Sequence, residues 1–147
     1  MSPRVSVRWA AVWRIALASG FGALVVSLLA TMLGLATLSV TTAVVLRTLF
    51  VTAVLVLLVP LAIRGDAVRP AGVERLGTVL VGGVLGYLVD LASWNGRAYA
   101  AQLVLDPGVL TFLLDLVLWL GVLWLGVRWR VPVTQAAPVE EPTGYVA

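Results

Sequence analysis

The longest nearly uncharged stretch of the chain sets the strongest limit on its fold. Between Ile15 and Ile63 the sequence runs for 49 residues with one charged side chain, Arg47. At about 1.5 Å per residue, a single helix of that length would measure roughly 73 Å, whereas the hydrocarbon core of a bilayer is only ~30 Å thick. This segment therefore predicts two membrane-spanning helices joined by a turn.

The composition of the whole chain is also typical of a membrane protein. Of its 147 residues, 61% are hydrophobic and 12% are charged, and the mean hydropathy is +1.07. Soluble domains carry about twice that charged share, roughly 25%. Cysteine and histidine are absent, which removes disulfides, thiolate nucleophiles, imidazole bases and nearly all zinc sites. We therefore expect an integral membrane protein that holds no cofactor and no metal.

Four apolar segments are long enough to cross a bilayer. The expected spans lie near Ile15–Ala36, Ala43–Ile63, Leu76–Trp94 and Val109–Trp129. The polar cluster of residues 37–42 supplies the first turn, and the charged residues 64–75, with their Gly and Pro, supply the second. The third connection, residues 95–108, closes with Asp106 as a helix N-cap and Pro107 as the first helical residue.

These spans predict an all-α fold. It is a polytopic integral membrane protein with four transmembrane helices in an antiparallel bundle over residues 15–129. Residues 1–14 form a cytoplasmic segment at the membrane interface, where their arginines are attracted to anionic lipid. Residues 130–147 hold three prolines and two adjacent glutamates, and we expect a disordered cytoplasmic tail. The first apolar run, of about 22 residues, exceeds the ~7–15 of a signal peptide, so we expect it to be retained.

The distribution of arginine predicts the orientation. The amino end has three arginines, the first turn none, the second loop three, the third loop one and the carboxyl end two. Because cytoplasmic flanks are enriched in basic residues, this alternation predicts that both termini are cytoplasmic. Trp9, Trp13 and Trp129 then anchor the inner membrane interface and Trp94 the outer one, where indole rings prefer to lie.

Three ionisable residues fall at membrane depth: Arg47, Asp90 and Asp115. A charged side chain inside the hydrocarbon costs about 2.5–3.5 kcal/mol on insertion scales, so each of them needs a partner or a function. Counted from the expected span ends, Arg47 and Asp90 lie ~7 Å below the outer surface and Asp115 about 9 Å. We expect one polar cluster in the outer third of the membrane.

Helical spacing gives the third expected span a face of small residues. Thr78, Gly82, Gly86 and Asp90 follow one another at intervals of four residues, so they share one face of a helix. The pair Gly82 and Gly86 lets another helix approach closely. We therefore predict a helix-packing face, with Asp90 directed into protein and not into lipid.

The polar cluster has two main interpretations. In one, Arg47 pairs with one or both aspartates and only fixes the register of the helices. In the other, one positive charge beside two negative ones leaves a carboxylate that tends to bind a proton, as in a proton- or cation-responsive site. In a third interpretation, the spans end at other residues than expected and Asp90 lies at the wet interface. Trp119 follows Asp115 by four residues, so its indole N–H is expected within reach of that carboxylate.

The soluble segments are too short for a catalytic domain, and no phosphate-binding loop, serine nucleophile motif or metal-ligand spacing occurs in the sequence. We expect a small non-enzymatic accessory or assembly subunit that acts through helix contacts in the lipid bilayer, with copies of itself or another membrane protein as partner. The alternative is an oligomeric small transporter or channel component that uses the polar cluster. The arginines are scattered, so we expect no nucleic-acid partner. The chain contains arginine but no lysine, which is typical of proteins from GC-rich genomes. The expected location is a prokaryotic plasma membrane.

Overall fold

The structure is built from α-helices. The computed structural model describes residues 7–32, 40–65, 67–92 and 109–133, apart from the side chains of residues 30, 31, 40–45, 47, 109 and 111. The helices in these ranges are α1 (Trp9–Met32), α2 (Val40–Ala62), α3 (Gly72–Ala92) and α5 (Val109–Arg130), and no strand occurs among them. The predictions of an all-helical chain and of four helices are confirmed for this part of the protein.

Three segments are long and apolar enough to cross a membrane: Trp9–Leu29, Gly72–Ala92 and Phe112–Arg130. The described side chains of α2 add a shorter apolar stretch, Thr48–Ala62. This pattern is that of a membrane protein, as the composition predicted.

The helices begin and end at slightly different residues from the expected spans. α1 begins at Trp9, because the carbonyl oxygen of Arg8 accepts the N–H groups of Ala11 and Val12, both at 3.0 Å. Residues 9–14, expected to precede the first span, are therefore its first turns. α2 begins at Val40 and so includes the last three residues of the expected turn, 40–42. Residues 37–39, the loop 95–108 with its Asp106 cap, and the tail from residue 134 lie outside the described residues.

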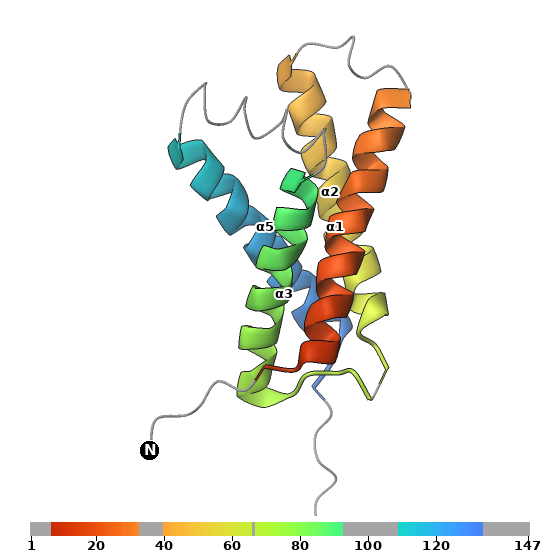
Figure 1. Ribbon diagram of the computed structural model, residues 1–147, viewed down its shortest axis with the longest axis vertical. Coiled ribbons are helices and arrows are strands. Elements are labelled where there is room, and N and C mark those ends of the chain that lie inside the picture. The colour runs from red at the N-terminus through yellow and green to blue at the C-terminus, as the bar shows by residue number, and fades with distance from the viewer. Residues whose placement is uncertain (1–6, 33–39, 66, 93–108, 134–147) are drawn as a thin grey trace, which may run out of the picture.

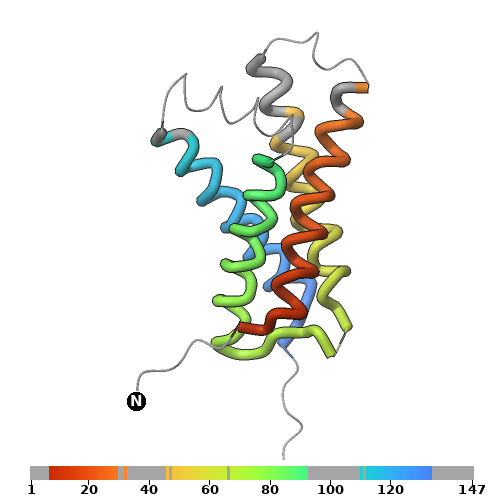
Figure 2. Tube along the Cα trace, viewed as in Figure 1, coloured from red at the N-terminus to blue at the C-terminus, as the bar shows by residue number. Residues whose placement is uncertain are grey.

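Successive helices run in opposite directions (Figure 1). α1 packs against α2 and α3, and α5 packs against the same two helices. The start of α1, the end of α2, the start of α3 and the end of α5 therefore lie together, at the lower end of Figure 2. We call this the arginine end, because it holds every arginine whose side chain is described: Arg8, Arg14, Arg64, Arg69, Arg75, Arg128 and Arg130.

Arginine side chains at this end cap two helices. The last carbonyl groups of a helix have no donor within the helix, and its carboxyl end is the negative pole of the helix dipole. Arg75 of α3, only 6% exposed, donates to the carbonyl oxygens of Val127, at 2.6 Å, and Val131 at the end of α5. Arg14 of α1 donates to the carbonyl oxygen of Ala62, the last residue of α2, at 3.3 Å. These contacts join α3 to α5 and α1 to α2 through backbone carbonyls.

The start of α1 is attached to α3 in a similar way. The backbone N–H of Arg8 donates to the hydroxyl of Thr78 at 3.0 Å, and the guanidinium of Arg8 donates to the carbonyl oxygen of Arg69. Thr78 is fully buried. The hydroxyl of Thr78, on the small-residue face, thus accepts from an amide at the start of α1. The first amides of a helix have no acceptor within the helix.

The two halves of α5 differ in their packing. In the carboxyl half, Leu123 and Val127 are fully buried, and Gly126 lies against α2, where a Cβ on it would be 3.0 Å from the Cα of Val56. The amino half leans away from α2 and α3 (Figure 1). Its apolar side chains are accordingly more exposed, with Leu110 at 70%.

Replacing Arg75 by methionine should lower the thermal stability of the protein in detergent. The carbonyl oxygen of Val131 loses the donor described for it, and that of Val127 keeps only the N–H of Val131, which predicts a fall of about 1–3 kcal/mol in the free energy of unfolding. Arg128→Met is the matched control, because Arg128 is exposed at the same end and carries the same charge. Equal melting temperatures for the two variants would contradict the capping role of Arg75.

Candidate functional site

The position of α3 is set by glycines that lie against α1. A Cβ on Gly82 would lie 2.8 Å from the Cβ of Ile15 and 3.0 Å from the carbonyl oxygen of Val12. A Cβ on Gly86 would collide with the hydroxyl oxygen of Ser19. Real Cβ atoms do not approach neighbours so closely, and the backbones of α1 and α3 can touch here only because both positions lack a side chain.

A third glycine, Gly83, lies against α5. A Cβ there would be 2.7 Å from side-chain carbons of both Leu120 and Leu123. The carbonyl oxygen of Gly83 accepts the indole N–H of Trp119 at 3.1 Å. The expectation that this indole donates to Asp115 is therefore wrong, because the ring is 94% buried against α3 and its N–H points to the α3 backbone.

Tyr87 provides the donor to Asp115 that sequence reasoning assigned to Trp119. Its hydroxyl donates to Oδ2 of Asp115 at 2.8 Å. The tyrosine ring meets the rings of Phe112 and Trp119 edge to face, with centroids 5.8 Å and 5.3 Å apart. Such T-shaped contacts are favourable between aromatic rings, and here they hold the hydroxyl toward the carboxylate.

The helical period explains why these groups meet. Tyr87 follows Gly83 by four residues on α3, and Trp119 follows Asp115 by four residues on α5. Because the two helices run in opposite directions, Trp119 lies at the level of Gly83 and Asp115 at the level of Tyr87. The only signal for Tyr87 in the sequence is a hydroxyl-bearing side chain within an apolar span, four residues from a glycine.

The two aspartates differ in their burial. Asp90 is 1% exposed near the carboxyl end of α3, and Asp115 is half-buried in the amino half of α5. Both lie in the part of their helix that is distant from the arginine end. The side chain of Arg47, their expected counter-ion, lies outside the described residues, so the proposed ion cluster stays a prediction.

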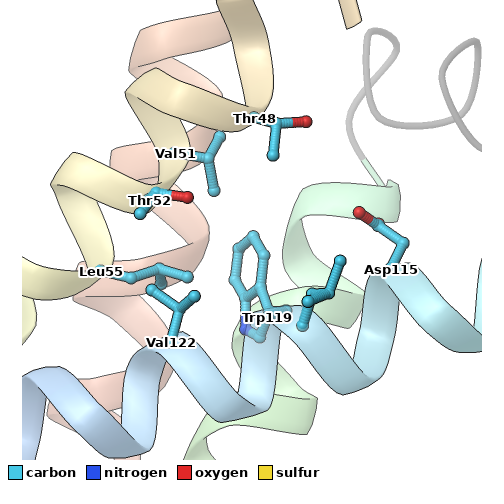
Figure 3. Close-up of a pocket in the computed structure, with 8 residues that line it drawn as sticks. Thr48, Val51, Thr52, Leu55, Asp115, Trp119 and Val122 are labelled. Carbon is cyan, nitrogen blue, oxygen red and sulfur yellow. The ribbon is translucent and has the colours of Figure 1, made fainter. Parts of the chain in front are cut away.

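A small cavity adjoins Asp115 between α2 and α5 (Figure 3). Thr48 and Thr52 of α2 and Trp119 of α5 line it together with Asp115. The remaining lining side chains are apolar: Val51, Leu55, Leu118 and Val122. Its volume of about 30 Å³ is enough for one or two water molecules.

The expected interfacial tryptophans are exposed where the structure describes them. Trp9, Trp13 and Trp129 are 60%, 57% and 86% exposed, and all three lie at the arginine end. Trp94 lies outside the described residues. Indoles beside arginines are typical of the headgroup region of a membrane.

The chemistry available at this site is that of hydrogen bonding and proton binding. The described residues contribute carboxylates, a phenol, threonine hydroxyls and an indole, and among them no three Asp or Glu side chains gather into a metal-ligand group. Comparison of the chain with protein-family models, with curated proteins and with solved structures found no match.

Replacing Gly82 and Gly86 together by leucine should prevent normal assembly of the protein. The added side chains must occupy the space of Ile15 and Ser19 and would force α1 and α3 apart. The matched control is leucine at Val81, which is half-buried, and at Val84, which is 37% exposed. Each of these replacements adds one methylene group, for which there is room. We expect a large loss of yield and thermal stability in detergent for the glycine variant alone. Similar values for both double variants would argue against a glycine contact.

Proposed function

We propose that the protein is an integral membrane protein with four spans, with the arginine end and both termini on the cytoplasmic side. α2 has 23 residues, which corresponds to about 35 Å and is sufficient for a ~30 Å hydrocarbon core. The arginines and the exposed Trp9, Trp13 and Trp129 at one end support this orientation, because basic flanks stay in the cytoplasm and indoles favour the interface. The proposed location is a prokaryotic plasma membrane.

Within that membrane, the proposed function is that of a non-enzymatic accessory or assembly subunit. The chain acts by packing its helices against another membrane protein or against further copies of itself. The observation that carries this proposal is the outward side of the amino half of α5, a helix that diverges from its neighbours toward its amino end (Figure 1). Five large apolar side chains of this half are 49–70% exposed: Leu110, Leu113, Leu114, Val117 and Leu118.

Apolar exposure alone would be satisfied by lipid, and Asp115 is what favours a protein partner. This carboxylate lies on the same half of α5, and although it has partners within the chain, Tyr87 among them, it remains only half-buried. A charged side chain at membrane depth costs about 2.5–3.5 kcal/mol unless it is paired or shielded. A helix packed on this half of α5 would shield the carboxylate from lipid and can bring further donors, as polar residues do between membrane helices.

A small transporter or channel component, assembled from several copies, is the second candidate. It is favoured by the burial of Asp90 and by the water-sized cavity beside Asp115. Buried carboxylates tend to bind protons, and acidic residues inside membrane proteins commonly mark ion or proton pathways. Proton flux into liposomes that contain the purified protein, measured with a pH-sensitive dye and abolished by Asp115→Asn, would support this function.

The orientation predicts a definite labelling pattern. The chain has no cysteine, so single substitutions Ser39→Cys, Ala71→Cys, Gly96→Cys and Thr143→Cys can each be treated with a membrane-impermeant thiol reagent. In intact cells we expect labelling at positions 39 and 96. Positions 71 and 143 should react only after the cells are permeabilised. The reverse pattern would place the arginine end outside.

Substitutions on α5 test the partner surface. In mild detergent, Asp115→Leu should weaken the association of the protein with its partner, or with further copies of itself, by about three- to thirtyfold. This range corresponds to the ~0.6–2 kcal/mol that a polar contact between membrane helices contributes. Leu114→Trp should also disrupt the complex sterically. Leu125→Trp is the matched control, because Leu125 is 58% exposed on the packed half of the same helix, compared with 53% for Leu114. Complex sizes measured by light scattering that do not differ among these variants would disprove the proposed surface.

A further inference from the structure

A groove runs along the outside of the molecule where α1 meets α2. It has a volume of about 450 Å³, within the range of small-molecule sites. Large apolar side chains form its walls, including Leu17, Phe21 and Val25 of α1 and Leu58 of α2, and each of these is about half exposed. The groove is therefore open toward the surroundings of the helices and is not part of their core.

The width of the groove limits what can occupy it. Along α1 it extends from Leu17 to Val26, a length of about 13 Å at the helical rise. Spread over that length, its volume corresponds to a narrow mean cross-section of about 35 Å². At the floor, Gly22 lies directly against the side chain of Val54. An extended chain of methylene groups fits this narrow apolar space.

A guanidinium lies at one end of the groove. Arg14 precedes Leu17, Phe21 and Val25 on the same face of α1, at intervals of three, four and four residues. Its hydrogen bond to the carbonyl oxygen of Ala62 holds it across the line where α1 and α2 meet. A guanidinium has five N–H donors in a fork that suits phosphate oxygens, and the bond to Ala62 uses one of them.

We propose that the groove binds one acyl chain of a phospholipid from the leaflet at the arginine end, with the lipid phosphate at Arg14. The proposal rests on the proposed insertion of the helices in a membrane. The groove length of about 13 Å is close to half of the ~30 Å hydrocarbon thickness, so an acyl chain can follow it from the headgroup layer to the middle of the bilayer. Exposed Arg64, two residues after Ala62, adds positive charge at the same end.

The binding of a defined lipid to the full-length protein tests this site. The probe is 1-palmitoyl-2-oleoyl-phosphatidylglycerol, added to the protein in mild detergent, and bound lipid is counted by native mass spectrometry. We expect one lipid per chain to bind preferentially. Arg14→Gln should weaken this binding about fivefold, the effect expected from one arginine near a membrane surface. Ala18→Phe should weaken it at least as much, because Ala18 lines the groove and the new ring fills it.

Two matched variants control for general effects of charge and bulk. Arg128→Gln removes an exposed arginine at the arginine end but on α5, and Ala53→Phe adds the same ring at an exposed position of α2 outside the groove. Both should bind the lipid as the parent does. Far-ultraviolet circular dichroism and melting temperature establish whether each variant is folded. If Ala18→Phe is not folded, lipid binding by Arg14→Gln alone decides whether the site exists.

Other outcomes would overturn the proposal. Equal lipid binding by parent, Arg14→Gln and Ala18→Phe would disprove the site. Equal binding of monoolein, which has acyl carbons but no phosphate, would disprove the role of Arg14. If Ala18→Phe reduced complex size and left lipid binding unchanged, the occupant would be a protein helix. Cysteine labelling reports membrane insertion separately, so failure of the lipid site and failure of the proposed topology are distinguishable.

Discussion

The direct approach of the α1 and α3 backbones is the contact on which the rest of the structure depends. In a bilayer, apolar side chains gain little by leaving lipid, so helix association depends on close packing and on polar contacts. Gly82 and Gly86 provide the close packing, and Thr78 on the same face binds the first amide of α1. With α3 held against α1, its opposite face presents Gly83 and Tyr87 to α5. The site around Asp115 is therefore a consequence of a contact made on the other side of α3.

The two ends of the molecule use polar groups differently. At the arginine end, guanidinium groups bind helix carbonyls and lie where a membrane would provide water and headgroups. Toward the other end, Asp90 is buried and Asp115 is half-buried, and Asp115 accepts a hydrogen bond from the phenol of Tyr87. Capping stabilises the arginine end from within the chain, and the proposed partner surface on α5 lies toward the opposite end.

The sequence predicted those features that depend on composition and on the period of a single helix. The length of the apolar segments was sufficient for the helices, and spacing by four placed Gly82 and Gly86 on one face. Contacts between helices were not predictable in this way. The partner of Trp119 was assigned wrongly because the rule of four considers only neighbours on the same helix, while the acceptor is Gly83 of α3. The start of α1 depends on Thr78, which is 70 residues from Arg8.

The attachment of α5 has a mechanical consequence. Its carboxyl end is fixed by Arg75 and by the contact of Gly126 with α2, while its amino half has few buried side chains. A rod fixed at one end acts as a lever. Leu110 lies 17 residues from Val127, about 25 Å along the helix, so a rotation of roughly 10° about the fixed end moves it by about 4 Å. Any rotation about the fixed end would be largest at the start of α5, and the bond between Tyr87 and Asp115 is a contact that such a rotation would have to stretch.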